Sequence, residues 1–291
     1  MNNPTQPVRC EGNPRSIKVL MYHRIVNDKA VSQKHWTSLH VDDFRKQLSL
    51  LDQWGYTALS LRDYQMFLDG KLDLPNKPVI LTFDDGYLDF YQCAYPLLHE
   101  FGFKAVVFVL GERKIKSNFW DERLGIGGAP LMDGRHILEL HEEGFEIGSH
   151  SLSHARLTEL PDDMVWEQVS RSRILLEILL DAPVTSFSYP YGLLNSAVKN
   201  AVRESGYTFA CSVGSGPAAF NGDCYEIRRI TIQSNTGISG FAVRLLTPFQ
   251  YFDWTRRKAS EVIGGLIKPR KGQVQPAHGP EQQHEQQGIL L

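Results

Sequence analysis

Residues 78–87, PVILTFDDGY, form an apolar run that ends in two adjacent carboxylates and a glycine. Such a run is typical of a strand that is buried on both faces. Side chains alternate along a strand, so Asp84 and Asp85 would point to opposite faces unless the chain bends there. Gly86 permits such a bend. Two close carboxylates repel each other unless a positive charge lies between them, so the stretch predicts either a metal site at a strand end or a surface turn.

Similar apolar runs alternate with longer segments of helical period from residue 17 onward. Helix-length connections between strands that are apolar on both faces imply parallel pairing. The pattern therefore predicts a (β/α) barrel or a doubly wound sheet. The other runs are IKVLMY (17–22), KAVVFVL (104–110), FEIGS (145–149), VTSFSY (184–189), TFACS (208–212) and YEIRRITI (225–232).

The composition is that of one large globular domain, since 42% of the 291 residues are hydrophobic. Lys and Arg number 31 against 33 for Asp and Glu, and the net charge of -2 gives no general attraction to nucleic acid or acidic membranes. The four cysteines form no C-x-x-C pair and are expected to be free thiols. No apolar run approaches the roughly 20 residues of a membrane span, and no signal peptide is evident, so we expect a cytoplasmic protein.

The chain is expected to be a single domain with terminal extensions. We predict a flexible N-terminus over residues 1–15, the barrel over 16–245, an aromatic and basic helical extension over 246–268, and a disordered tail over 269–291. The extension is expected to pack on the barrel, with contact to a membrane surface as the alternative. Residues 111–132 form a long insertion rich in glycine and charge, which predicts either the rim of a site or a flexible loop.

Two histidines follow the run at 145–149 and reach the same edge of the predicted sheet as the carboxylates. His150 and His154 are four apart, so a helical turn or a loop can present both imidazoles to one point. Parallel sheets and barrels place their sites at the carboxyl ends of their strands, where these side chains and Asp84 and Asp85 can meet. One Asp with two His is an open site that suits zinc, although other divalent metals accept it. The second Asp is then free to act as a general base in hydrolysis. Taken alone, the two adjacent aspartates would indicate a surface turn, and the two histidines would indicate surface residues.

Two further predicted strands end in candidate site residues. FSYPYG, residues 187–192, contains a proline and a glycine that force an irregular turn, which can aim backbone N–H groups into a site. Tyr191 is well placed for this role, and the alternative is a packing tyrosine. His23 follows the first run, and an amide hydrolase needs an acid to protonate the departing amine. A lone histidine in that position is otherwise structural.

Three motifs together resemble those of the polysaccharide deacetylases of carbohydrate esterase family 4. They are TFDDG at 82–86, HSLSH at 150–154 and SYPYG at 188–192, and the resemblance extends over about residues 17–235. It implies a distorted (β/α) barrel of about seven strands. It also implies metal-dependent hydrolysis that removes acetyl from an N-acetylamino sugar, or from an O-acetyl ester in some members.

The resemblance implies a role for each matching residue. Asp84 would be the catalytic base, and Asp85, His150 and His154 would bind a divalent metal, with Zn²⁺ preferred and Co²⁺, Ni²⁺ or Mn²⁺ as alternatives. Tyr191 would supply a backbone N–H to the oxyanion of the reaction.

Two departures from the family pattern resemble the branch of biofilm poly-N-acetylglucosamine deacetylases. Ser188 stands where the family has an arginine that orients the base, and no Leu-x-His motif follows the barrel to supply the acid. In that branch the motif order is permuted and an N-terminal Tyr-His carries the acid role, which Tyr22 and His23 match. In that branch an arginine late in the barrel also lies near the site. Alternation sends Arg228 and Arg229 to opposite faces, and we predict that Arg229 points inward.

The predicted protein is therefore a metal-dependent hydrolase that removes an N-acetyl group from an amino sugar in a polysaccharide, oligosaccharide or glycan precursor. The expected partner is an acetylated amino-sugar glycan or a lipid- or nucleotide-linked sugar, with no nucleic acid, no transmembrane span and peripheral membrane contact as an alternative. The missing export signal favours a cytoplasmic precursor, and the sequence does not set the oligomeric state. The alternatives are hydrolysis of another C–N bond or an O-acetyl ester on the same fold, and a catalytically silent glycan-binding domain.

Overall fold

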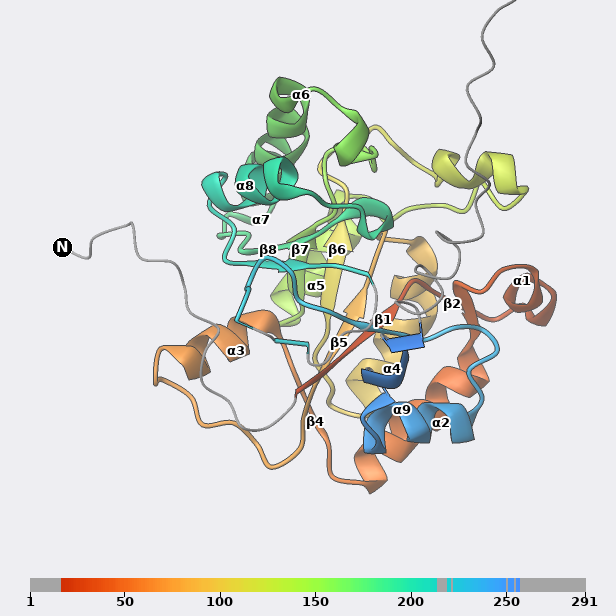
Figure 1. The fold of residues 1–291 in the computed structure, drawn as a ribbon. Helices are drawn as coiled ribbons and strands as arrows, with labels where there is room; N and C mark the ends of the chain where they lie inside the picture. Colours follow the sequence, from red (N-terminus) through yellow and green to blue (C-terminus); the bar gives the residue numbers. More distant parts are fainter. Residues whose placement is uncertain (1–16, 214–218, 221, 250, 254, 257–291) are drawn as a thin grey trace, which may run out of the picture. The chain divides into compact units, whose positions relative to one another are not determined.

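A parallel sheet of eight strands is the centre of the fold (Figure 1). Its order is β10-β1-β5-β6-β7-β8-β9, with β4 paired to β5. The strands are β1 (Lys18–Tyr22), β4 (Thr57–Leu59), β5 (Pro78–Phe83), β6 (Val106–Val109), β7 (Glu146–Ser149), β8 (Ser186–Ser188), β9 (Phe209–Cys211) and β10 (Ile230–Thr231). Two more strands, β2 (Arg24–Val26) and β3 (Ser38–His40), pair with each other. These statements concern the residues that the computed structural model describes, namely 17–213, 219–220, 222–249, 251–253 and 255–256.

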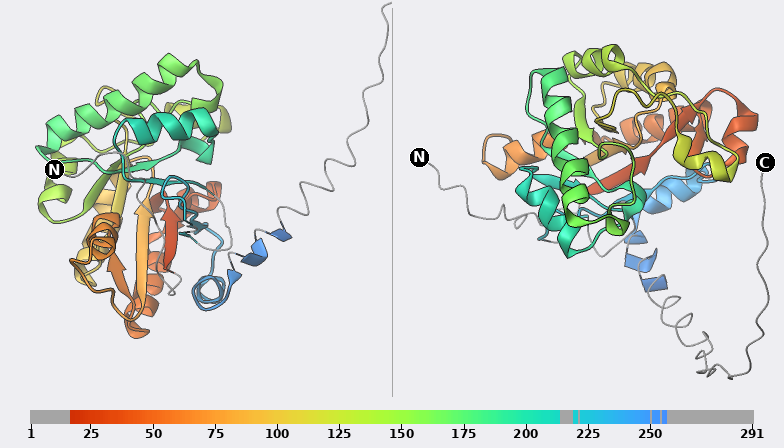
Figure 2. Two further views of the ribbon diagram at one scale, coloured as in Figure 1. Left: turned by 60° about the vertical axis from the view of Figure 1, so that its left-hand side comes forward. Right: turned by 90° about the horizontal axis from the view of Figure 1, so that it is seen from above.

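Helices connect the strands, as the sequence pattern predicts. They are α1 (Lys29–Lys34), α2 (Val41–Gln53), α3 (Leu61–Leu68), α4 (Tyr95–Glu100), α5 (Gly134–Glu142), α6 (Asp162–Trp166), α7 (Ser172–Leu180), α8 (Ser196–Glu204) and α9 (Ile238–Leu246). A π-helical turn, Glu167–Arg171, joins α6 to α7, and Figure 2 shows the three segments as one long helix. A second π-helical turn, Phe90–Ala94, precedes α4.

The strand side chains alternate between two buried layers, which explains why the runs are apolar throughout. Leu20, Leu81 and Val107 belong to a cluster that also contains the buried side chains of most of the helices. Their neighbours Val19 and Ile80 belong to a second cluster, which fills the inside of the curved sheet. The register pairs Val19 with Ile80 and Leu20 with Leu81, so adjacent strands send equivalent residues to the same face.

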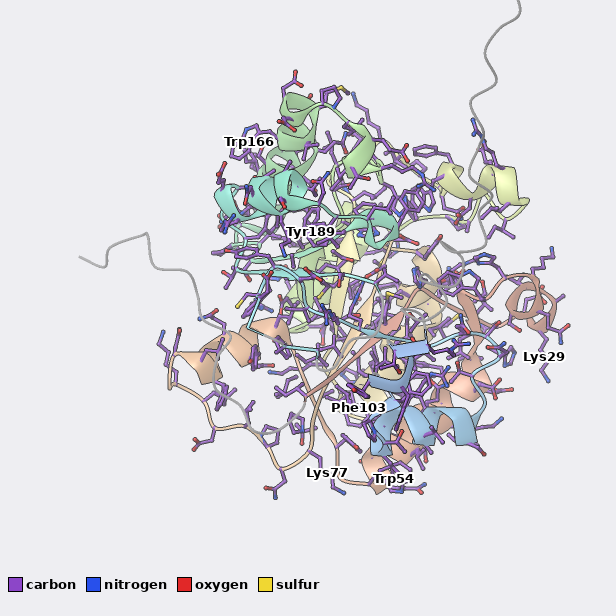
Figure 3. All side chains as sticks on the ribbon, in the orientation of Figure 1. Lys29, Trp54, Lys77, Phe103, Trp166 and Tyr189 are labelled. Carbon is purple, nitrogen blue, oxygen red and sulfur yellow. The ribbon has the colours of Figure 1, made fainter. Side chains whose placement is uncertain are left out.

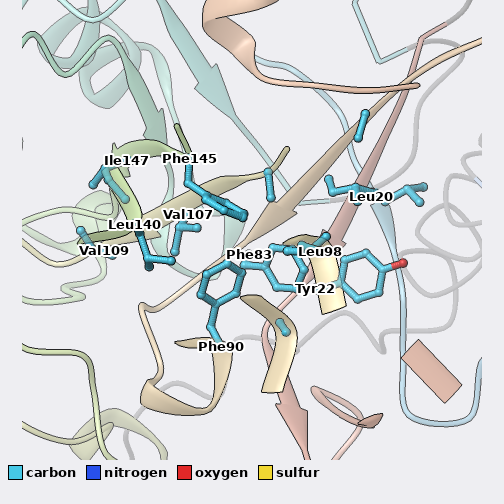
Figure 4. Packing of buried hydrophobic residues seen from close by; sticks show 14 of the residues in the cluster. Leu20, Tyr22, Phe83, Phe90, Leu98, Val107, Val109, Leu140, Phe145 and Ile147 are labelled. Carbon is cyan, nitrogen blue, oxygen red and sulfur yellow. The ribbon is translucent and has the colours of Figure 1, made fainter. Parts of the chain in front are cut away.

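The outer layer also holds the strand ends from which site residues continue (Figure 4). The rings of Tyr22 and Phe83 stack with their centroids 5.1 Å apart, and Phe90 packs edge-on against Phe83 at 4.7 Å. The Tyr22 hydroxyl donates a hydrogen bond to Gln47 in α2. His23 and Asp84 directly follow these two stacked residues, so their backbone positions are held by packed aromatic rings.

The two ends of the sheet approach each other through the segment that leads into β10. Ile227 forms a parallel bridge with Cys211 of β9, and Ile230 pairs with Leu20 of β1. The sheet therefore curls into a distorted (β/α) barrel, in which seven strands follow one path. The predicted barrel is confirmed, and the alternative prediction of an open doubly wound sheet is wrong.

One expectation about the cysteines is wrong. Cys224 is disulfide-bonded, whereas Cys93 and Cys211 are free and buried. A disulfide requires two Cα atoms within about 7 Å, and spacing along the chain does not reveal such proximity.

The predicted terminal segments are described only in part. The described residues up to Thr255 belong to one compact unit, and α9 ends at Leu246, next to the predicted end of the barrel. The predicted flexible N-terminus (1–15) and disordered tail (269–291) lie outside the described residues. Over the part of the chain with assigned structure, no helix is long and apolar enough to cross a membrane.

Candidate active site

Asp84 and Asp85 face one site because the chain bends where β5 ends. Asp84 continues the strand, and its N–H donates to the carbonyl of Tyr22 at 3.1 Å. Asp85 and Gly86 then both adopt the left-handed region, with φ of 75° and 73°. A Cβ at Gly86 would lie 2.9 Å from Cγ1 of Val109, so this position requires glycine both for its backbone conformation and for space.

Asp85, His150 and His154 form a buried cluster at the carboxyl edge of the sheet. Oδ1 of Asp85 lies 3.1 Å from Nε2 of His150 and 3.2 Å from Nε2 of His154. One potential ligand atom from each residue lies within 4.8 Å of the others. Ser151 and His154 both have positive φ, of 65° and 59°, so a loop rather than a helical turn presents the two histidines.

The hydrogen bonding of this cluster fits a bound cation. Nδ1 of His150 lies 2.8 Å from the carbonyl oxygen of Ser188 and must donate to it. In the neutral ring Nε2 then carries a lone pair, which faces the carboxylate of Asp85, and a cation between the two acceptors removes their repulsion. Burial raises the pKa of Asp85, but the two imidazoles that face it lower the pKa by more, to well below its ordinary value, so the carboxylate is ionised and can bind a cation. Two imidazoles and one carboxylate are a donor set that zinc accepts at an open site.

Asp84 makes a separate, fully buried ion pair with Arg229. Nη1 and Nη2 of Arg229 each lie 2.7 Å from one oxygen of Asp84. The three other N–H groups of the guanidinium donate to Thr82 Oγ1, Ser188 Oγ and the carbonyl of Ser212, so all five donors are used. Burial raises the pKa of Asp84, but the charge and hydrogen bonds of Arg229 lower it by more, and its net pKa lies below the ordinary value.

The structure places Arg229 and Arg228 on opposite sides of the chain. Arg229 is fully buried, whereas the partly exposed Arg228 donates to Glu226 at 3.3 Å. Ser188, where the family arginine is missing, donates to Asp84 Oδ2 at 3.2 Å. The guanidinium of Arg229 therefore contacts both the carboxylate and the serine.

His23 and Tyr191 lie in the same cleft as the carboxylates. The cleft has a volume of about 950 Å³, and both residues line it. Trp36 packs edge-on against the His23 ring, with centroids 5.4 Å apart. Tyr191 has a left-handed backbone with φ of 58°, its ring packs against His154 at 4.6 Å, and the Arg156 guanidinium lies 4.4 Å from the centre of that ring.

Sequence analysis assigned no role to several residues of the site. Thr82 and Ser212 hold Arg229, and Trp36, Trp120 and Arg156 line the cleft. For Thr82 a signal existed, since it lies two residues before Asp84 and so on the same face of the strand. Trp120 lies in the 111–132 insertion, which was expected to form a rim or a flexible loop and which the structure places in the cleft wall.

Comparisons with known proteins agree with the motifs. Residues 71–210 match the family described as Polysaccharide deacetylase, a range that excludes His23 and Arg229. YxkH of Bacillus subtilis, named as a polysaccharide deacetylase, is 28% identical over 231 residues, which are 79% of this chain and 75% of that protein. The poly-beta-1,6-N-acetyl-D-glucosamine N-deacetylase of Escherichia coli K12 is 24% identical over 253 residues, covering 76% of this chain and 37% of that enzyme.

A solved structure has the same fold. The Streptococcus pyogenes deacetylase PplD, determined in complex with acetate, superposes with a TM-score of 0.69 at 25% identity. The match covers 80% of this chain and 99% of PplD.

Proposed function

Because residues 71–210 of this chain are a polysaccharide deacetylase domain, we propose that the protein is a metal-dependent hydrolase that removes the N-acetyl group from an amino sugar of a glycan. One observation carries the proposal. A three-residue cluster suited to a cation, Asp85 with His150 and His154, shares a cleft with a second carboxylate, Asp84, that is not part of the cluster. Metal-assisted hydrolysis of an amide uses a Lewis acid and a base, and one of the two adjacent carboxylates belongs to the cation cluster while the other is available as the base.

The cluster of Asp85, His150 and His154 would hold the metal, with Zn²⁺ preferred and Co²⁺, Ni²⁺ or Mn²⁺ as alternatives. A divalent cation bound there would activate water and polarise the acetyl carbonyl. The His150 hydrogen bond to Ser188 fixes the tautomer that leaves Nε2 free for the cation.

Four other residues would carry out the proton transfers and stabilise charge. Asp84 accepts a proton from the attacking water, and Arg229 keeps this carboxylate ionised and oriented. The backbone N–H of Tyr191 donates a hydrogen bond to the acetyl oxygen as negative charge develops on it. His23 then donates a proton to the departing amine.

The substrate we propose is a polymer that contains N-acetylglucosamine. The E. coli relative is named for poly-beta-1,6-N-acetyl-D-glucosamine, and the 950 Å³ cleft is at the upper end of the range for sites that hold drug-sized ligands. The disulfide at Cys224 supports an oxidising compartment, where such bonds persist. This favours an exported glycan over the cytoplasmic precursor that sequence analysis predicted.

Acetate release tests the proposed function. The full chain, stripped of metal by a chelator, is incubated with N-acetylglucosamine oligomers, O-acetylated glycans and nucleotide-linked N-acetylhexosamines, with Zn²⁺ or Co²⁺ restored. We expect metal-dependent release from the oligomers. Release from O-acetylated glycans alone would favour the esterase, and glycan binding without release would favour a silent domain.

The rate of deacetylation should follow a bell-shaped pH profile, because Asp84 must be ionised while His23 must be protonated. The rate rises as Asp84 ionises, and its lowered pKa places this limb at acidic pH. A general acid must hold the proton that it donates, so the rate should fall again on the alkaline side. In His23→Asn the residual rate should be about 10²- to 10⁴-fold lower and should lack the alkaline limb. His99→Asn, an exposed histidine in α4, is the control, and an alkaline limb that persisted in His23→Asn would contradict the assigned acid.

A further inference from the structure

The two histidines of the cluster are oriented in different ways. His150 is fixed by the hydrogen bond from its Nδ1 to the carbonyl of Ser188, which is the usual device for a metal-binding histidine. Nδ1 of His154 is also buried, but it has no hydrogen-bond partner among the described residues. Something other than a hydrogen bond must therefore set the orientation of the His154 ring.

Aromatic rings surround His154 instead. The indole of Trp120 lies nearly parallel to the imidazole, with centroids 4.2 Å apart and an angle of 18° between the planes. Tyr191 packs edge-on at 4.6 Å, with an angle of 69°. These two contacts restrict rotation of the His154 ring, so that Nε2 stays 3.2 Å from Asp85 Oδ1.

Stacking by Trp120 also favours the metal-bound form of the ring. An imidazole that donates its lone pair to a cation becomes electron-poor, and the face of an indole carries negative charge density. Parallel stacking on Trp120 therefore stabilises His154 more when a metal is bound than when it is not. A leucine, which is smaller and has no aromatic face, would keep an apolar contact without this electrostatic contribution.

Trp120 is itself held in place by the insertion. Asn118, which is buried, donates to Asp121 and the carbonyl of Ile126 and accepts from the N–H of Ala129, which closes the loop on itself. The end of the insertion hydrogen-bonds to the loop that carries Asp85, since the N–H of Met132 donates to the carbonyl of Gly86 at 2.9 Å. The segment that supplies Trp120 is thus attached to the segment that supplies a metal ligand.

We propose that Trp120 is a positioning residue for metal binding, acting on His154 by stacking where His150 is positioned by a hydrogen bond. The inference rests on the proposed metal site. It gives the 111–132 insertion a role in metal affinity that no motif in the sequence indicates.

Metal affinity tests the proposal in the full chain. Zn²⁺ binding is measured by calorimetry, and the visible spectrum of the Co²⁺ form reports the geometry of its ligands. Outer partners of metal ligands typically contribute about 10- to 100-fold in affinity, so Trp120→Leu should bind Zn²⁺ at least ~10-fold more weakly and show an altered Co²⁺ spectrum. Trp120→Phe, which keeps an aromatic face, should recover most of the affinity. Trp166→Leu, an exposed tryptophan in α6 (Figure 3), is the matched control and should bind as wild type does.

The possible results separate this proposal from the proposed function. A wild-type protein that binds no metal would overturn both. Tight binding by wild type, together with unchanged affinity and an unchanged Co²⁺ spectrum in Trp120→Leu, would overturn the role of Trp120 alone.

Should Trp120→Leu fail to fold, quenching of tryptophan fluorescence by Co²⁺ gives a second test. Most of the quenching should disappear in Trp120→Phe, and quenching that the substitution left unchanged would contradict the placement of Trp120 at the metal.

Discussion

Asp84→Asn should lower the rate of acetate release by about 10²- to 10⁴-fold while leaving metal binding in place, because in the proposed mechanism Asp84 is the base and not a metal ligand. The neighbouring substitution Asp85→Asn should abolish activity for a different reason, since it removes the carboxylate that lies between His150 and His154. Zn²⁺ titration by calorimetry, together with acetate release at saturating metal, separates the two effects.

The two aspartates are adjacent, so each variant serves as the matched control for the other. An exposed carboxylate in α2, Asp43, provides a control for the loss of charge alone, and Asp43→Asn should leave both quantities unchanged. Asp84→Asn also leaves the charge of Arg229 without its partner, so its folding must be verified by circular dichroism before the rate is interpreted. A folded Asp84→Asn protein with a rate near that of wild type would show that another group is the base.

Arg229→Met should lower the free energy of unfolding by about 3–5 kcal/mol, the usual cost of removing one partner of a buried ion pair. The substitution leaves the buried carboxylate of Asp84 without its cation and removes the hydrogen bonds that Arg229 donates to Thr82 and Ser188. Arg228→Met is the matched control. Arg228 is partly exposed, and among the described residues it forms an ion pair only with Glu226. Its substitution should therefore change the free energy of unfolding by less than about 0.5 kcal/mol. Urea denaturation at pH 7 measures both.

The stability difference between wild type and Arg229→Met should shrink as the pH falls from 7 towards 4. In wild type the pKa of Asp84 lies below its unfolded value of about 3.9, so its stabilising contribution is present above that pH and is lost as the pH falls through the folded pKa. In the variant, burial without Arg229 raises the pKa of Asp84 instead, and protonation on acidification relieves the buried charge. A difference that stayed constant over this range would contradict the assignment of the lost energy to this ion pair.

Sequence pattern predicted the strands that lie in apolar runs and missed three short strands outside them. Strand β5 covers the apolar part of the stretch PVILTFDDGY and ends just before its two carboxylates. Strands β1, β6, β7 and β8 lie within their predicted runs. Their burial on both faces of a parallel sheet makes every position apolar, which is a strong local signal. The three-residue strands β2, β3 and β4 were not predicted, since none of them lies in one of the apolar runs. The strands β8, β9 and β10 are no longer than these, but they do lie in such runs.

The site was predicted to the extent that its residues follow strands. His23, Asp84 and His150 each directly follow a strand, and parallel strands share one carboxyl edge, so their meeting needed no knowledge of contacts. An arginine late in the barrel was expected from the family resemblance, and the period of a strand indicated only that one of Arg228 and Arg229 points inward. The structure shows that Arg229 is the buried one. From the sequence, either a helical turn or a loop could present His150 and His154 to one point. The positive φ of His154, which only the tertiary structure shows, identifies the loop.

Local pattern was thus sufficient for parallel strands joined by helices, for the sheet edge that carries the candidate site and for the residue types expected there, because each depends on the period of a strand or on a motif within a few residues. The choice of a barrel over a doubly wound sheet came from the family resemblance. The five hydrogen bonds of Arg229 and the stacking of Trp120 on His154 came only from the tertiary structure. Each joins residues far apart in the chain, and the distance between such residues is set by how whole elements pack, which no local period encodes.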